Sequence, residues 1–443
     1  MRIRTRPASR WALVGVAAAV AAAAAVSAGL AGVSGTRGDP SLRGVSKPVV
    51  VATAKTASFI SAVSDTRRNR VYATWSISFS NNPDTRVYVA ASTDGGRTFA
   101  KPVWLARDNG AGQSVVRVDG NGRVWATWTH YDLKHEDLLD PKQKYSNPSW
   151  QELAYSDDAG RTWSRPVDVP ADHGLRHGSA FGALAVSPSG KKVSVFWIDY
   201  LPVFDPRVKP AGRDAGTYLA ATSVDGGKSF GPVRKIVQTG CVCCEPFGLS
   251  LDGRTALLFR GWQKATVKHD LRDIKLTVAV PGGGWTAPVS VHDDHFLLHH
   301  CPSVGPAGAV DRAGLLHVAW WTGATGRAGY WYAIRGTDGT FGTPVEIEAH
   351  PSAPNENNAT ITLDGNGTVW TATVGHGDFA ANGNVDTSPN QALVYTITGS
   401  GKPRLVKAAT VDGSYPQLAA VPGAVVEVWA NAGRLLARRL EVR

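Results

Sequence analysis

The residues of this 443-residue chain that are best suited to chemistry are four cysteines and a group of histidines. Cys241, Cys243 and Cys244 form the sequence C-V-C-C, and Cys301 is the fourth cysteine. Thiolates combined with imidazole nitrogens suit Cu(I) or Zn(II). The histidines that could complete such a site are His177, His299 and His300. The only methionine is the initiator, so thioether ligands are excluded.

Disulfide bonding is the alternative for the same cysteines. Their number is even, and oxidising compartments favour pairing. Four cysteines allow three connectivities, and the adjacent Cys243 and Cys244 need different partners if both are to pair without strain. A redox-active pair is a third alternative. The sequence leaves all three open.

A repeated short phrase indicates which elements position these residues. An aromatic residue followed closely by Pro-Val occurs five times, at intervals of 64, 67, 55 and 56 residues. Three copies follow the longer motif S-x-D-x-G-x-[TS]-[FW], which begins at Ser92, Ser156 and Ser223. An Asp side chain can bond turn amides, and Gly accepts positive φ at low cost. Such a repeat with β-rich flanks predicts a radial β array with one sheet per repeat.

A second phrase gives the number of units. Apolar strand-forming segments, each preceded by another strand and a turn, end at Trp75, Trp128, Trp197, Arg260, Trp320, Val374 and Trp429. They predict an all-β propeller with seven blades. Six blades are the alternative, because the S-x-D-x-G-x-[TS]-[FW] motif is degraded in the last two units. Only one strand, 434–442, follows Trp429. We expect the segment beginning Lys47-Pro-Val-Val-Val to close the last blade, so that no free edge remains.

The boxed motif resembles the Asp-box, or BNR, repeat of sialidase-like β-propellers. Between Cys241 and Thr322, the sequences CVCCEP, HCPSVGP and HVAWWTG also resemble a bacterial family of exported BNR-repeat proteins with a C-x-C-C … C-P-x-x-G-P pattern. Val242 and Ser303 stand where that family commonly has Asp and Asn. The resemblance implies the fold, but a fold does not imply an activity. Sialidases resemble six-bladed propellers, so seven units are a departure.

If the resemblance extends to activity, it implies arginines that hold a substrate carboxylate, a Tyr nucleophile backed by a Glu, and an Asp acid/base. The candidates are Arg260, Arg272, Glu245 and Asp199. Arg260 stands where the other strands have Trp or Val, so its charge needs a partner or a ligand. The first unit lacks an Arg-Ile-Pro-type sequence, and no tyrosine stands out. A sialidase-type glycoside hydrolase is therefore the alternative and not the favoured function.

Repeat spacing places the chemically suited residues on one face. The Asp boxes occupy turns between third and fourth strands, and eleven of the twelve histidines fall in loops on the opposite, top face, with only His317 inside a strand. Cys241, Cys301 and His177 occupy equivalent positions in three units, so we expect them to lie together at the mouth of the propeller's central channel. Binding residues concentrate on such loops. We expect a metal or a glycan to bind there in an accessory role; the second alternative is a disulfide-stapled protein-interaction platform.

The N-terminal segment predicts export. Four arginines precede an uncharged run from Trp11 to Thr36, which is typical of a signal peptide over residues 1–28, or of an uncleaved anchor because the run is long enough to span a bilayer. Residues 29–46 read as a linker, and residues 47–443 form a single propeller domain. The domain is then secreted or tethered at the outer face of the cytoplasmic membrane, and the membrane is a partner only if the segment stays uncleaved.

The charge of the chain indicates no nucleic-acid partner. The net charge is +11, and four of those charges lie in the first 28 residues, which leaves 43 basic against 36 acidic residues, or +7. The basic residues are scattered, and no basic stripe interleaved with aromatic residues is present.

Overall fold

The computed structural model describes residues 41–54, 56–77, 85–106, 109–132, 149–169, 179–199, 215–266, 269–298, 302–350, 358–375, 390–398 and 401–443. Within these ranges all regular structure is β-strand except two short 3-10 helices, Thr66–Arg68 and Lys407–Ala409. None of these described ranges contains a helix that is long and apolar enough to cross a membrane. The prediction of an all-β fold is confirmed.

The first three sheets of the described chain are four-stranded and antiparallel. Sheet 1 contains β3 (Ala57–Asp65), β4 (Arg70–Ile77), β5 (Arg86–Ser92) and β6 (Val103–Trp104). Sheet 2 contains β7 (Ala111–Val118), β8 (Val124–Tyr131), β9 (Ser149–Ser156) and β10 (Val167–Val169). Sheet 3 contains β11 (Ser179–Val186), β12 (Val193–Asp199), β13 (Ala215–Ser223) and β14 (Arg234–Cys241).

The next three sheets repeat this order. Sheet 4 contains β15 (Phe247–Leu251), β16 (Arg254–Arg260), β19 (Ile274–Val278) and β20 (Val289–Ser290). Sheet 5 contains β22 (Ala307–Val310), β23 (Leu316–Thr322), β24 (Gly329–Arg335) and β25 (Val345–Ala349). Sheet 6 contains β26 (Thr360–Leu363), β27 (Val369–Val374), β28 (Gln391–Thr398) and β29 (Lys402–Leu405), with β30 (Val411–Asp412) also on β28.

Sheet 7 combines the two ends of the described chain. It contains β31 (Ser414–Val421), β32 (Ala424–Asn431) and β33 (Arg434–Val442), and both β2 (Val49–Thr53) and β1 (Leu42–Val45) pair antiparallel with β33. The sequence predicted the pairing of β2. It did not predict β1, which lies in the segment assigned to a linker; the signal peptide, residues 1–28, falls outside the described residues.

A small three-stranded sheet was also missed. It contains β17 (Gln263–Lys264), β18 (Asp270–Leu271) and β21 (Leu297–Leu298), and each of its strands has only two residues. A pair of residues carries no periodicity, so sequence patterning cannot detect such strands.

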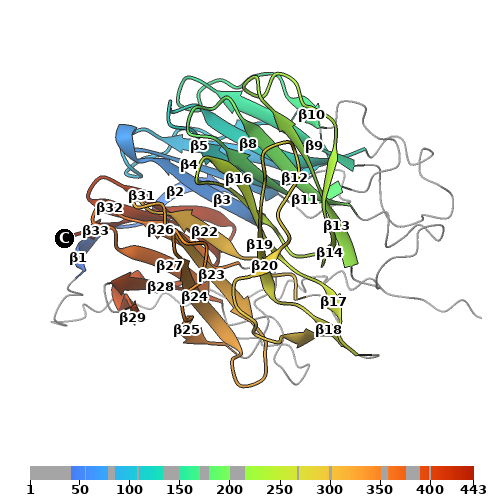
Figure 1. The fold of residues 1–443 in the computed structure, drawn as a ribbon. Coiled ribbons are helices and arrows are strands. Elements are labelled where there is room, and N and C mark those ends of the chain that lie inside the picture. The colour runs from blue at the N-terminus through green and yellow to red at the C-terminus, as the bar shows by residue number, and fades with distance from the viewer. Residues whose placement is uncertain are drawn as a thin grey trace, which may run out of the picture. The chain divides into compact units, whose positions relative to one another are not determined.

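Residues of the first strands of the seven sheets line one cavity. These strands, β3, β7, β11, β15, β22, β26 and β31, contact one another in that order, and β31 contacts β3. The two ends of the described chain therefore lie side by side: in Figure 1, blue β2 and β3 lie beside red β31, β32 and β33. Residues from all seven first strands line a cavity of about 330 Å³, which is called the cavity below.

Polar groups organise the Asp-box turns. In the second box, Ser156 Oγ donates to Asp158 Oδ1 at 2.9 Å and accepts from the Gly160 amide at 2.8 Å. Thr162 donates its amide to Asp158 Oδ1 at 2.9 Å and its hydroxyl to Oδ2 at 2.6 Å. The boxes at Ser92 and Ser223 repeat these contacts. The boxes are therefore structural, as the sequence indicates.

A second turn repeat connects the first and second strands. Asp119 accepts turn amides and the Trp125 indole N–H six residues later at 3.3 Å, and Asp364 does the same for Trp370 at 2.9 Å. In sheet 5, His317 Nε2 lies 3.4 Å from Asp311 Oδ2 at the same spacing. His317 is buried in the core and occupies the position that tryptophan has in the other two sheets.

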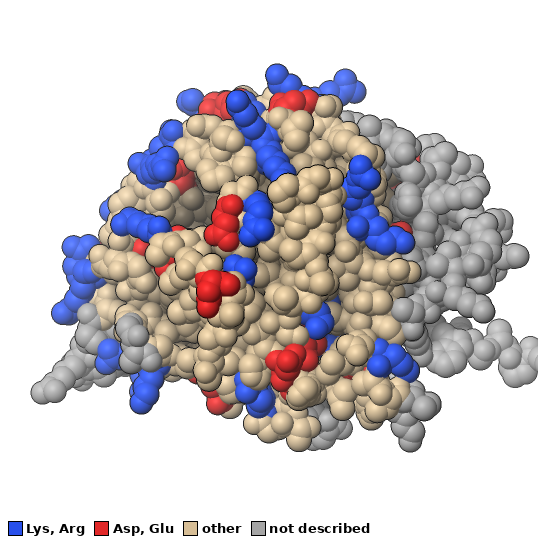
Figure 2. Space-filling model, in the orientation of Figure 1, with Lys and Arg blue, Asp and Glu red and all other residues tan. Residues whose placement is uncertain are grey.

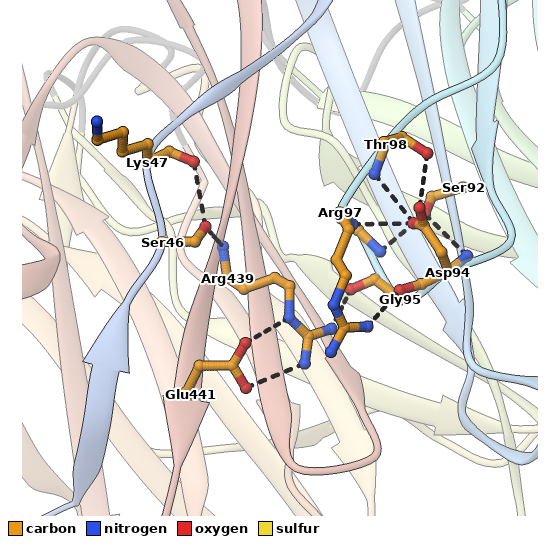
Figure 3. A network of polar contacts seen from close by, with 10 residues as sticks. Ser46, Lys47, Ser92, Asp94, Gly95, Arg97, Thr98, Arg439 and Glu441 are labelled. Atoms are coloured by element: carbon orange, nitrogen blue, oxygen red, sulfur yellow. Dashed lines mark hydrogen bonds and ion pairs between the residues drawn. The ribbon is translucent and has the colours of Figure 1, made fainter.

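Contacts of Arg439 join sheet 7 to sheet 1, as Figure 3 shows. Arg439 lies in β33 and donates from Nε to Glu441 Oε1 at 2.6 Å and from Nη2 to Oε2 at 3.1 Å. Its Nη1 also donates to the carbonyl of Gly95, in the first Asp box. Its amide donates to Ser46 Oγ at 2.9 Å. One residue thus connects the N-terminal segment, through its backbone amide, with the last strand and the first box, through its side chain.

Replacing Asp158 by Asn tests the role of the boxes. Hydrogen bonds from Thr162 hold the pKa of Asp158 at about 2, below its ordinary 3.8. The ionised carboxylate therefore adds stability above pH 4, and this stability is lost as pH falls from 3.8 to about 2. We expect Asp158→Asn to lower the thermal unfolding midpoint by roughly 1–2 °C at pH 7. Thermal melts at a series of pH values should show the difference in midpoint between wild type and Asp158→Asn shrinking toward pH 2.

The matched control for this test is Asp293→Asn, because Asp293 is exposed and its side chain forms no hydrogen bond or ion pair within the described residues. Its midpoint should follow that of the wild type at every pH. A deficit for Asp158→Asn that stays constant from pH 7 to pH 2 would contradict the assigned contacts.

Candidate functional site

The cysteine cluster lies between sheets 3 and 4. Cys241 ends β14, and a disulfide joins it to Cys244 in the connection to β15. Both residues are buried, and the Tyr218 hydroxyl lies 3.1 Å from the Cys241 carbonyl and 3.2 Å from that of Cys244. Cys243 is also disulfide-bonded. The disulfide alternative is therefore supported for Cys241 and Cys244, and Cys301 lies outside the described residues.

The proposed metal ligands divide into two groups. The sulfurs of Cys241, Cys243 and Cys244 all lie within 4.8 Å of one another. A metal ligand must be a thiolate, and disulfide sulfurs are not thiolates. In this oxidised state the described residues therefore do not fit Cu(I) or Zn(II). The remaining predicted ligands are outside the described residues: His177, His299, His300 and Cys301.

Arg260 is fully buried. The sequence implied that its charge needs a partner or a ligand, and main-chain carbonyls of the protein serve as its partners. Its Nε donates to the Val304 carbonyl at 2.8 Å, Nη1 to the Arg272 carbonyl at 2.8 Å and Nη2 to the Trp321 carbonyl at 2.7 Å. Burial lowers the pKa of Arg260 to about 10, with Asp294 opposing the shift. The guanidinium therefore stays charged at neutral pH and connects sheet 4 to sheet 5.

The other glycosidase candidates do not form one site. Arg272 is fully buried, with Nη2 3.5 Å from Asp270 Oδ2. Asp199 is the last residue of β12, the second strand of sheet 3, and is buried opposite Ser179. Among the four candidates, only Glu245 lines the cavity.

Glu245 meets residues of two other sheets at the cavity. Asn358 donates from Nδ2 to Glu245 Oε2 and accepts the Gly305 amide at Oδ1. These residues precede the first strands β15, β26 and β22. Glu245 and Asn358 both line the cavity, together with Phe247. Sequence spacing missed Asn358, because the loop conformation decides which side chain reaches the cavity.

The histidines are less uniformly placed than the sequence suggested. His130 was assigned to a loop, but it lies in β8, is buried and stacks on Trp150 with ring centroids 4.5 Å apart. The strand continues three residues beyond Trp128, to Tyr131, and Trp150 of β9 pairs opposite His130. His292 Nδ1 lies 2.8 Å from Asp294, which also accepts the Trp320 indole N–H at 2.8 Å.

Comparisons with known proteins establish the fold class. No family model matches the sequence, and no functionally curated protein matches it either. Among solved structures, the BP39L lectin from Burkholderia pseudomallei has a TM-score of 0.57 and 12% identity over 87% of this chain and 96% of its own. The Hadza microbial sialidase Hz136 has a TM-score of 0.52 and 14% identity over 88% of this chain and 66% of its own.

A third similar structure is a protein of unknown function from Dyadobacter fermentans, with a TM-score of 0.50 and 12% identity over 91% of this chain and all of its own. Identities this low show the fold alone. The chain has an all-β, sialidase-like fold of the kind found in propeller proteins, built mostly from four-stranded sheets.

Replacing Arg260 tests its structural role. Arg260→Ala leaves three buried carbonyls without their donor, so we expect a loss of about 3 kcal/mol or more in unfolding free energy. Arg260→Lys should also be destabilised, because one ammonium group cannot reproduce the guanidinium fork. Urea unfolding followed by tryptophan fluorescence measures both.

Arg254→Ala is the matched control for Arg260, since Arg254 lies in the same strand, is 42% exposed at its side chain and is 3.8 Å from Asp252. Its loss should be below about 0.5 kcal/mol. Equal stability of Arg260→Ala and Arg254→Ala would overturn the structural role.

Proposed function

We propose that this chain is an exported, seven-bladed, sialidase-like propeller that binds a glycan at the cavity mouth near Glu245. The blade number is supported by the seven sheets of four or five strands and by the contacts that return from β31 to β3. Closure is supported by the pairing of β2 with β33. Export rests on the N-terminal sequence, and the domain is then secreted or held at the outer face of the membrane.

The observation that carries the binding function is the meeting of Glu245 and Asn358 at a cavity lined by all seven first strands. Small-molecule sites are concave and mainly apolar, with a few convergent polar groups. Carboxylates accept and amides both donate and accept hydrogen bonds, which suits sugar hydroxyls. Phe247 adds an apolar surface nearby. A lectin and a sialidase have similar folds, which supports the glycan by analogy only.

A binding role is favoured over sialidase-type hydrolysis because Arg260 and Arg272 are fully buried and Arg260 is engaged by main-chain carbonyls. A metal site of Cu or Zn is the second candidate, favoured by the three sulfurs within 4.8 Å, and requires the reduced state. A disulfide-stapled protein-interaction platform is the third.

Glycan binding by the full-length protein, exported to the periplasm of a bacterial host, tests this function. A glycan array selects the ligand, and calorimetry then gives its affinity for wild type and Glu245→Gln. Loss of one charge-assisted hydrogen bond predicts binding about tenfold weaker. Glu346→Gln, at an exposed position of β25, is the matched control and should bind as the wild type does.

The other functions give different results on the same sample. Near-stoichiometric Cu or Zn by mass spectrometry, with free thiols and loss in Cys241→Ser, would favour the metal site. Release of the fluorophore from a fluorogenic sialoside would favour the hydrolase. No retained glycan, no metal and no free thiols would leave the interaction platform in place of the proposed function.

A further inference from the structure

Arg117 places a positive charge in the cavity. It lies near the end of β7, is partly exposed and belongs to the cavity lining. Its Nη1 donates to the Val116 carbonyl at 2.9 Å. Its guanidinium carbon lies 4.5 Å from the centroid of the Phe247 ring, which belongs to β15 of sheet 4. The side chain therefore extends from sheet 2 to an aromatic ring two sheets away.

No carboxylate among the described residues forms an ion pair with Arg117. Burial lowers the pKa of Arg117 to about 10, so the side chain remains charged at neutral pH. Glu245 is the other charged residue of the described cavity lining, and it accepts from Asn358. An arginine that is partly removed from water and has no carboxylate paired with it is open to a counter-charge, so the cavity favours an incoming anion.

Two serine hydroxyls lie on the same lining. Ser114, also in β7, is only 3% exposed, and its Oγ has no hydrogen-bond partner among the described residues. Ser61 Oγ accepts the Val116 amide at 3.3 Å, which leaves the hydroxyl proton available to another acceptor. Both serines can donate to an oxyanion. The unpartnered Ser114 is independent of the argument from charge.

We propose that Arg117 forms an anion site in the cavity that binds a small molecule with a carboxylate or phosphate-type group. A guanidinium presents planar, paired donors that match both kinds of oxyanion. The volume of about 330 Å³ lies within the range of small-molecule sites. This inference rests on the proposed function, since it uses the same cavity, and it deepens that function by giving the ligand an acidic group.

Arg86 provides a matched control outside the cavity. It lies in β5, its guanidinium carbon is 5.4 Å from the centroid of Trp104, and its Nε donates to Asn109 Oδ1 at 2.8 Å. It therefore shares with Arg117 an aromatic neighbour and a neutral oxygen acceptor, but it is not part of the cavity lining. A change specific to Arg117→Gln and absent from Arg86→Gln reports on the cavity.

Calorimetry on the full-length exported protein at low ionic strength tests the site. The probes are inorganic phosphate, acetate, glucuronate and the uncharged sugar glucose. We expect at least one anion to bind the wild-type protein. Its affinity for Arg117→Gln should be at least about tenfold lower, because a charged hydrogen-bond donor is lost. Arg86→Gln should bind as the wild type does, and added salt should weaken binding. Comparing phosphate with the two carboxylates identifies which group the site prefers.

Arg117→Lys and Ser114→Ala keep the test decisive if Arg117→Gln fails to fold. The lysine variant retains the charge and should bind better than the glutamine variant, whereas the alanine variant should bind more weakly than the wild type. Anion affinity that is equal in wild type, Arg117→Gln and Ser114→Ala overturns the site, as does the absence of binding by every anion. Glycan binding that depends on Glu245 without anion binding overturns only the anion site. Anion binding without any glycan binding overturns only the proposed glycan.

Discussion

The antiparallel pairing of β2 with β33 is the contact on which the rest of the described arrangement depends. A final sheet of three strands would present the backbone groups of β33 to any other strand. Instead, Val49–Thr53 comes from the start of the chain and covers β33, while Arg439 connects the same strand to the Gly95 carbonyl of the first Asp box. These contacts place sheet 7 next to sheet 1. Only in that position can β31 touch β3 and all seven first strands line one cavity.

Contacts in the turns and in the core stabilise the sheets away from the first strands. Asp158 and its equivalents hold the turns between outer strands, and Asp119 and Asp364 each hold a turn and a buried tryptophan. Large buried indoles fill the space between sheets. The cavity lining, by contrast, includes a partly exposed charge, Arg117. The face in Figure 2 gives no comparable focus, since lysine and arginine are scattered among acidic residues there.

Much of the fold could be predicted from the sequence, because repeated residues have repeated causes. Turn aspartates, glycines and aromatic residues recur at each unit, and they predict the strands around Trp75, Trp128 and Trp320 as well as the N-terminal strand on β33. The limits of strands were less predictable. His130 and Asp199 belong to strands because their partners, Trp150 and Ser179, extend the pairing, and those partners are distant in sequence.

The candidate site was predictable only in part. The cysteines were identified, but cysteine connectivity cannot be deduced from sequence, and the Cys241–Cys244 disulfide is visible only in three dimensions. Arg260 was recognised as unusual, yet its partners are carbonyls, which leave no signature in a sequence. Arg117 and Asn358 resemble ordinary polar residues of a strand and a loop. Their significance arises from the cavity, which seven separate sheets create together.

Hydrogen exchange of Val49–Thr53 in the full-length protein, measured by mass spectrometry, tests the central structural claim most directly. If β2 pairs with β33, amides of this segment exchange slowly, and they become faster together with those of Arg434–Val442 when Arg439→Gln removes the contacts to Gly95 and Glu441. Exchange of Val49–Thr53 at the rate of an unstructured peptide, while β33 remains protected, would contradict the account.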